Sequence, residues 1–212
     1  MTLANEALKL NSAWRRRHTK ARQLPALFLM TDPIRLPDPL PVLRRLPSGA
    51  GVIFRCYADG ADAPGRLALA RRIRTACRAR RQVLLIAGDD ALAHRVRADG
   101  IHLAEWRLAR GGWKRGQARA RRGLITGAAH GPAALHLARR AGIDAVLLAP
   151  VFATQSHPGA KVIGRLRFAM LARRGPLPVY ALGGIGPATV RRLRGSGAGG
   201  LAGIGGFGGP QT

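Results

Sequence analysis

The chain has 212 residues, of which 47% are hydrophobic, and it carries a formal net charge of +26 at pH 7. This length can bury the core of one domain, and no run of 18 apolar residues predicts a membrane helix. The N-terminal region lacks the apolar segment of a secretory signal. We therefore expect a cytoplasmic protein with no membrane partner, and its two cysteines to be reduced thiols.

The positive charge comes almost wholly from arginine, because only four of the 36 basic residues are lysine. Clustered arginines can bind nucleic-acid phosphates, but most of them fall in segments that favour helix, such as Ala70–Arg81. On the outside of a helical shell they would form a solvated face, so a nucleic-acid partner is not favoured. A charge of this size would instead steer a phosphorylated small molecule toward the protein.

Residues 1–24 predict a basic helical lead-in, and residues 25–212 predict one domain of alternating strands and helices. Helical patterns cover Pro64–Arg80 and Pro132–Ala141. A short helix is predicted after Asp90, which can cap its N-terminus. Another helix is predicted to begin near Pro187 and to end at Gly195. The segment 107–121 is rich in glycine and arginine and predicts a helix or a loop. Eight apolar runs have the length of buried strands: 26–30, 51–54, 82–86, 100–103, 124–127, 145–149, 179–182 and 201–204.

Strands that alternate with helices and end in glycine or polar loops are typical of a (β/α)8 TIM barrel, a closed parallel sheet with helices outside. The chain is short for this fold, for which about 250 residues are typical. Eight residues follow the last predicted strand, so we expect the final helix to be short or missing. In such barrels the chemistry lies at the carboxyl ends of the strands.

Glycine pairs follow the last two predicted strands: Gly183 with Gly184, and Gly205 with Gly206. In barrels these two loops often form a phosphate cradle, because glycine lets the backbone approach a phosphate closely. A helix that begins near Pro187 would add positive potential. We therefore predict that these four glycines bind phosphate; ordinary tight turns are the alternative.

His130 follows the fifth predicted strand directly, so its side chain should face the barrel mouth. Histidine can transfer protons near neutral pH, which makes His130 the candidate catalytic residue; a polar rim residue is the alternative. His102 lies inside the fourth strand and favours a structural role. The loop after the sixth strand holds three candidate ligand contacts: Thr154, Ser156 and His157.

Several segments, in order, resemble the thiamine phosphate synthase/TenI family between about Leu27 and Phe207. The matching motifs stand at the strand ends of that family: RADGIHLAE (97–105), TGAAH (126–130), LLAPVFATQSH (147–157), VYALGGI (179–185) and GAGGLAGIGGF (197–207). The resemblance implies a (β/α)8 barrel with a role in thiamine biosynthesis. Synthases of the family join a pyrimidine pyrophosphate to a thiazole phosphate, with magnesium on the pyrophosphate. The TenI branch aromatises a thiazole phosphate tautomer with a histidine that His130 would match.

The same resemblance implies a changed cation site. The magnesium aspartates of the family would fall on Gly88 and Arg107, and its pyrophosphate-contacting lysine would fall on His157. Only Arg55 keeps its place in the motif of the second strand. We therefore expect magnesium to have lost its ligands here, unless a one-residue shift brings in Asp89 or Asp90. No cofactor is firmly implied.

Arginine would take the place of the metal in this interpretation, because Arg55 and Arg107 can bind phosphate oxygens through their planar guanidinium groups. The sequence thus predicts a thiamine phosphate synthase/TenI-like protein that acts on or binds a phosphorylated thiazole or thiamine phosphate. Intact magnesium-dependent synthase activity is not expected. Two alternatives are a thiazole tautomerase that uses His130 and a non-catalytic barrel that binds a phosphate ligand or regulates. A homo-oligomer is left open.

Overall fold

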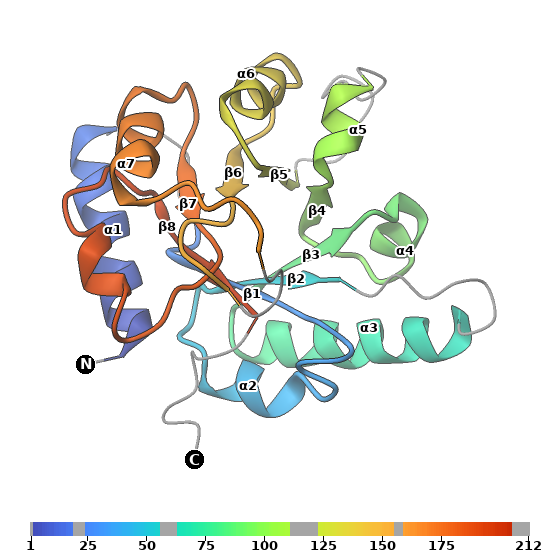
Figure 1. The fold of residues 1–212 in the computed structure, drawn as a ribbon. Helices are drawn as coiled ribbons and strands as arrows, with labels where there is room; N and C mark the ends of the chain where they lie inside the picture. Colours follow the sequence, from blue (N-terminus) through green and yellow to red (C-terminus); the bar gives the residue numbers. More distant parts are fainter. Residues whose placement is uncertain (1, 19–23, 56–62, 111–122, 155–158, 205–212) are drawn as a thin grey trace.

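A computed structural model of the chain describes residues 2–18, 24–55, 63–110, 123–154 and 159–204. Its eight strands all run parallel and close into a barrel in sequence order, with β8 pairing with β1 (Figure 1). The predicted (β/α)8 fold is therefore confirmed, and each predicted strand lies within two residues of an observed one. The strands are β1 Leu27–Met30, β2 Gly51–Phe54, β3 Val83–Ala87, β4 Gly100–Leu103, β5 Leu124–Ala129, β6 Ala145–Leu148, β7 Val179–Ala181 and β8 Gly200–Gly203.

The helices surround the barrel, as Figure 1 shows. They are α1 Leu3–Arg17, α2 Leu40–Arg45, α3 Ala63–Ala79, α4 Asp90–Arg95, α5 Glu105–Ala109, α6 Pro132–Arg140, α7 Arg165–Arg174 and the 3₁₀ helix η2 Val190–Leu193. Two details differ from the sequence prediction. Asp89, not Asp90, caps α4, because its side chain accepts a hydrogen bond from the Leu92 amide at 2.8 Å. The helix expected from Pro187 is only the four-residue η2.

The helix α1 packs on the outside of the barrel beside β8 and β1. Its apolar residues Leu3, Ala7 and Leu10 are buried in the same cluster as the barrel wall. Asn11 donates a hydrogen bond to the Gly199 carbonyl at 2.7 Å, and Glu6 forms an ion pair with Arg194 at 2.7 Å. This helix covers the strand β8, after which no helix follows within the described residues.

Alternate residues of each strand point into the barrel, since successive side chains of a strand face opposite sides. Phe28 and Tyr180 fill the interior, with their rings edge-to-face at 5.0 Å, and the Tyr180 hydroxyl donates to the Pro25 carbonyl. The interior is thus a packed core, as expected for a barrel of this size. Space for a ligand therefore lies at the ends of the strands.

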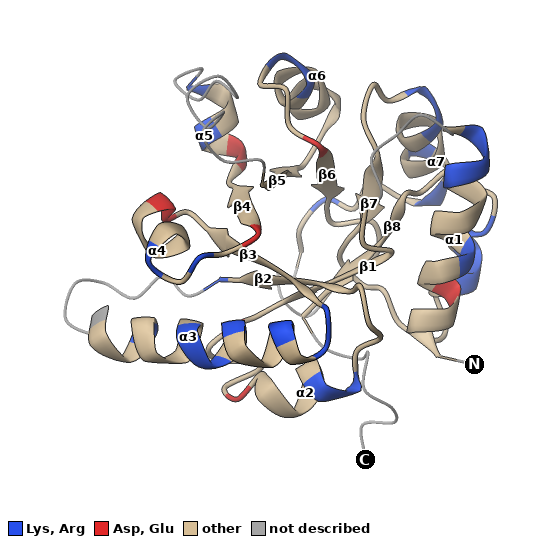
Figure 2. Cartoon of the chain, turned by 180° about the vertical axis from the view of Figure 1, so that it is seen from behind, with Lys and Arg blue, Asp and Glu red and all other residues tan. Residues whose placement is uncertain are grey.

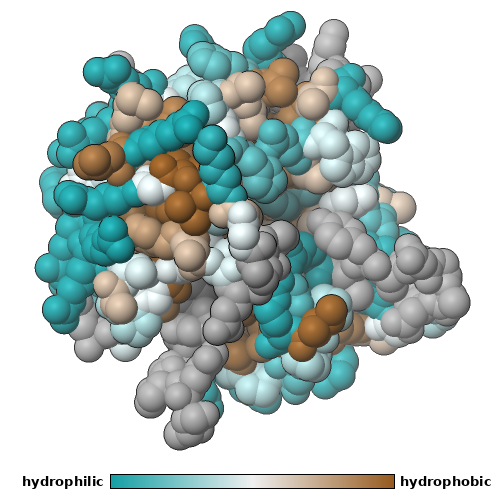
Figure 3. All heavy atoms as spheres, in the orientation of Figure 1, coloured by the Kyte–Doolittle hydropathy of each residue, from teal (hydrophilic) through white to brown (hydrophobic). Residues whose placement is uncertain are grey.

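Lysine and arginine are spread along α1, α3 and α7 on the outside of the barrel (Figure 2). Figure 3 shows hydrophilic side chains over much of one face, with an apolar patch among them. This distribution is that of a solvated shell, as the sequence predicts. Within the described ranges, no helix is long and apolar enough to cross a membrane.

Candidate active site

The carboxyl ends of β4 and β5 bring Glu105 and His130 together. Glu105 is the first residue of α5, just after β4, and His130 follows β5 directly. The strands are neighbours, with Leu103 opposite Gly127. His130 Nδ1 lies 2.5 Å from Glu105 Oε2, and the His130 amide donates to the same oxygen at 2.8 Å. One carboxylate thus holds both the ring and the backbone of His130.

The imidazole of His130 remains open to solvent, because 62% of its side chain is exposed. With Nδ1 directed at Glu105, the other ring nitrogen, Nε2, can meet a ligand. A histidine at a strand end with one nitrogen held and the other accessible is equipped for proton transfer. The predicted position of His130 after the fifth strand agrees with this geometry.

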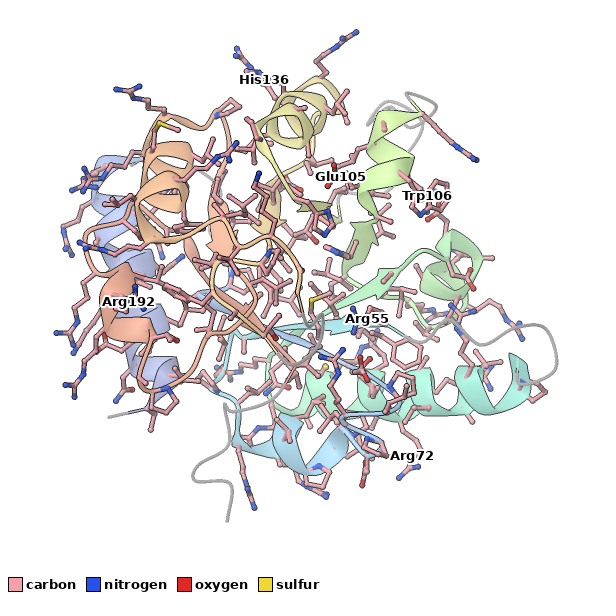
Figure 4. The ribbon with its side chains drawn as sticks, in the orientation of Figure 1. Arg55, Arg72, Glu105, Trp106, His136 and Arg192 are labelled. Carbon is pink, nitrogen blue, oxygen red and sulfur yellow. The ribbon has the colours of Figure 1, made fainter. Side chains whose placement is uncertain are left out.

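The ends of β1 and β2 carry an aspartate bound by two arginines. Asp32 Oδ2 lies 2.6 Å from Arg55 Nη2 and 2.7 Å from Arg35 Nη2. Burial alone would raise the pKa of Asp32, but hydrogen bonds from the Arg35 backbone and side chain outweigh it, and the pKa is lowered. Asp32 therefore stays ionised and anchors Arg55, which lies near the ends of β2 and β3 in Figure 4.

Two further aspartate–arginine pairs follow β3. Asp89 Oδ2 accepts a hydrogen bond from Arg66 at 2.7 Å, while its other oxygen caps α4. Asp90 accepts two hydrogen bonds from the Arg107 guanidinium, at 3.2 and 3.3 Å. Burial acts to raise the pKa of Asp89, yet the hydrogen bonds of the Leu92 amide and Arg66 lower it overall. Both carboxylates already have cationic partners.

These pairs bear on the magnesium that the fold family implies. Magnesium prefers oxygen ligands in a near-octahedral shell and is usually held through carboxylates. Gly88 offers no side-chain ligand, Arg107 is a cation, and Asp89 and Asp90 are engaged by arginines. Among the residues that the structure describes, no group of three or more His, Cys, Asp or Glu side chains could hold a metal ion. The residues present do not fit this cation.

His102 lies in the barrel interior below the charged rim. It is buried, and its Nδ1 lies 2.8 Å from the Thr126 hydroxyl on β5. Burial lowers the pKa of His102 to about 4, and the nearby positive charge of Arg55 adds to the effect. The ring is therefore neutral near pH 7, in keeping with the structural role that the sequence favours.

The loop after β7 has the backbone shape that the predicted phosphate cradle requires. Gly183 and Gly184 both have positive φ, at 89° and 64°. A Cβ on Gly184 would stand 2.3 Å from the Ala153 carbonyl oxygen, and one on Gly183 would stand 2.8 Å from Pro150. Only glycine fits this close approach between the loops after β6 and β7.

The same loop presents backbone donors. Within the described residues, the amides of Gly184 and Ile185 donate no hydrogen bond. The Gly184 carbonyl is tied down by the Thr189 hydroxyl at 2.7 Å, which fixes the peptide orientation. Backbone amides that have no partner within the protein can bind an anion. Since η2 is a four-residue 3₁₀ helix, the helix-dipole contribution expected near Pro187 is smaller than a full α-helix would give.

Several predicted site residues fall outside the described ranges: Ser156, His157, Gly205 and Gly206. Thr154 is described and half-buried, in the loop after β6. His130 and Glu105 come together at the ends of β4 and β5, and Arg55 lies with Asp32. Arg107 faces Asp90 rather than open solvent, with 21% of its side chain exposed.

Sequence reasoning missed three residues that shape this site: Asp32, Arg66 and Glu105. Each follows or faces a strand end, and two are acidic in a chain with only 10 acidic residues. That scarcity was the available signal, because an acidic side chain just after a buried strand is unusual here. The arginine partners gave no such signal, since arginine occurs throughout the chain.

The architecture defines a (β/α)8-barrel protein, and its candidate site lies at the carboxyl end of the sheet, where such barrels carry their chemistry. A family model described as thiamine monophosphate synthase (TMP-TENI) matches residues 30–207. An Aquifex aeolicus protein, provisionally assigned as thiamine-phosphate synthase 2, is 34% identical over 137 residues, covering 64% of this chain and 72% of its own. The thiamine-phosphate synthase of Alcanivorax borkumensis is 27% identical over 180 residues, covering 83% and 82%.

Among solved structures, the thiamine phosphate pyrophosphorylase from Pyrococcus furiosus superimposes with a TM-score of 0.64 at 19% identity, over 83% of each chain. That likeness supports the fold. The family match covers most of the sequence. The chain therefore belongs to the thiamine monophosphate synthase family, as its motifs predict.

Proposed function

We propose that this protein binds a phosphorylated thiazole at the mouth of its barrel and moves a proton on it with His130, as a thiazole tautomerase of thiamine biosynthesis. The observation that carries the proposal is the contact of His130 with Glu105, which holds one ring nitrogen and leaves the other accessible. Proton transfer needs such a group within reach of the substrate. It needs no bound metal.

The phosphate of the substrate would bind at the loop after β7. The Gly184 and Ile185 amides can donate to phosphate oxygens, because neither makes a hydrogen bond within the described residues. In barrels the loops after the seventh and eighth strands often hold phosphate. The sequence also predicts Gly205 and Gly206 as phosphate-binding residues, and both lie outside the described residues.

Arginine, not magnesium, would neutralise the remaining anionic charge at the mouth. A guanidinium has five N–H donors, so Arg107 can hold Asp90 with two of them and still donate to a ligand. Arg55 is placed by Asp32 in the same way. A divalent cation beside Arg107 would be repelled. We therefore propose that ligand binding here is independent of magnesium.

The second candidate function is the synthase reaction itself, the joining of a pyrimidine pyrophosphate to a thiazole phosphate. The family model and the names of the relatives favour it. The aspartate–arginine pairs count against it, since they leave the pyrophosphate without the cation on which that reaction depends.

Parallel assays of the purified protein would test the proposal. One assay follows aromatisation of the thiazole phosphate tautomer in EDTA, and the other follows thiamine phosphate formation from both synthase substrates with magnesium. We expect turnover in the first and none in the second. Magnesium-dependent condensation would favour the synthase, and binding of thiazole phosphate with no turnover in either assay would indicate a non-catalytic barrel.

A further inference from the structure

We propose that Glu105 is a positioning residue that fixes the tautomer and orientation of His130, so that Nε2 is the proton acceptor. This inference rests on the proposed function, in which His130 moves a proton. It adds the reason why this histidine, among the six in the chain, would be set for the task. Figure 4 places Glu105 at the start of α5, on the rim of the barrel.

The hydrogen bonding determines which nitrogen carries the proton. An ionised carboxylate only accepts hydrogen bonds, so at 2.5 Å from Glu105 Oε2 the Nδ1 atom must be the donor. In a neutral imidazole the other nitrogen then holds the lone pair. His130 is thereby locked as a base at Nε2, which points away from Glu105.

The position of the carboxylate does not depend on the ring. The amide of His130 donates to the same Oε2 atom at 2.8 Å, and this bond would persist if the ring rotated. Glu105 is also placed at the first residue of a helix, where a negative charge is favoured. Neighbouring strand ends bring the two residues together, because β4 and β5 are paired in register.

The arrangement gives a balanced proton step. Nε2 takes a proton from a carbon of the thiazole ring, and the electron pair of that C–H bond forms a new ring double bond. The imidazolium then returns a proton to the carbon at the other end of the conjugated system, whose existing double bond supplies the electron pair for the new C–H bond. One C–H bond and one double bond are thus broken, and one of each is formed. While the ring carries two protons, the Glu105 charge balances it.

A purely structural role for Glu105, bracing the turn after β5, would make a different prediction. NMR of the protein labelled at the histidine ring nitrogens separates the two roles, with the His130 signals assigned by their loss in His130→Asn. In the wild type at a pH where the ring is neutral, we expect a protonated Nδ1 and an unprotonated Nε2. The opposite tautomer in the wild type would overturn the inference, whatever the variants do.

The variants extend the test. Glu105→Ala should release the tautomer, whereas Glu105→Gln keeps an acceptor oxygen at the same reach and should retain it. We expect kcat in the aromatisation assay to fall in Glu105→Ala by less than the roughly 100-fold expected for loss of His130 itself. The loss should be smaller in Glu105→Gln, with little change in KM, since Glu105 does not hold the phosphate. Asp38→Asn, an exposed carboxylate that only caps the Leu40 amide, is the matched control and should leave the tautomer and kcat unchanged.

The failure of this inference is separable from that of the proposed function. If His130→Asn abolishes turnover while Glu105→Ala keeps both the wild-type kcat and the wild-type tautomer, Glu105 does not position His130. If His130→Asn turns over normally, the proposed function itself fails.

Discussion

The two sides of the barrel mouth differ in the groups that they present to a ligand, which are charged side chains on one side and backbone on the other. From β1 to β5 the strand ends carry charged side chains, in pairs such as Asp32 with Arg55 and Glu105 with His130. From β6 to β7 the site is backbone, shaped by Gly183 and Gly184 against the loop after β6. One side depends on which side chain stands opposite which, and the other depends on side chains being absent.

This difference suggests how the chemistry of a barrel can change while its ligand class stays the same. A glycine cradle binds phosphate whatever the neighbouring strands do, because its donors are peptide groups. The charged side alters its chemistry with a single substitution, as where Arg107 stands at a position that the family resemblance assigns to a magnesium aspartate. We therefore expect substitutions on the two sides to have separable effects.

The largest effect is expected on the charged side. His130→Asn should lower turnover of the thiazole phosphate tautomer about 100-fold or more, because the variant lacks the group that accepts the proton. Binding of the phosphate should change little. Steady-state kinetics measure both, with His136→Asn on the exposed face of α6 as the control (Figure 4). Wild-type kinetics in His130→Asn would show that His130 is a polar residue of the rim with no part in proton transfer.

On the backbone side, Gly184→Val should weaken phosphate-ligand affinity by about 10–100-fold, the equivalent of one hydrogen bond to a charged group. The new side chain would collide with the Ala153 carbonyl and is unfavourable at positive φ. Gly186→Ala is the matched control, since nothing lies within 4 Å of its added Cβ. Calorimetry measures the affinity, and circular dichroism checks the fold. Equal affinity in the two variants would show that the loop after β7 does not bind the phosphate.

Arg107→Asp should lower phosphate-ligand affinity by about tenfold, because it removes one charged donor and leaves two carboxylates close together. Arg72→Asp makes the same change of charge on the exposed face of α3 and should have a much smaller effect (Figure 4). The comparison separates a local contact from the general field of a chain with net charge +26. An equal loss of affinity in the two variants would show that Arg107 acts only through the overall positive charge of the protein and not through a local contact.

A separate effect concerns the stability of the barrel below the mouth rather than ligand binding. The pKa of His102 is lowered from 6.5 to about 4 in the folded state, so the unfolded chain binds its proton first as the pH falls. His102 therefore costs no stability above pH 6.5, and between pH 6.5 and 4 it lowers the free energy of unfolding by up to about 1.4 kcal/mol per pH unit. Urea unfolding of His102→Gln across that range should show a shallower slope than the wild type. Parallel slopes would contradict the burial of a neutral His102.

Much of the fold could be predicted from the sequence, for a physical reason. Strands buried on both faces are short apolar runs, and glycine or polar residues mark where each one stops, so β2 and β4 were predicted at their observed bounds. The length of the helix at η2 was overestimated from the sequence. Pro187 and Gly195 signal the ends of a helix, but they do not show whether the residues between them can form a full α-helix.

A candidate for the site could be named from the sequence only where a single residue and its place in the chain were enough. His130 stood out by its place after a strand, and the glycines by their pairing. Glu105 did not, because its role depends on the register that sets the ends of β4 and β5 side by side. Asp89 and Asp90 could be seen as carboxylates, but their engagement by Arg66 and Arg107 depends on side-chain contacts between separate elements.

Calorimetric titration of thiazole phosphate into the wild-type protein, once in EDTA and once in excess magnesium, tests the central claim most directly. The claim is that arginines and a glycine backbone hold the phosphate at this mouth without a metal. We predict the same affinity under both conditions. Tenfold tighter binding with magnesium would contradict the claim and restore a cation to the site.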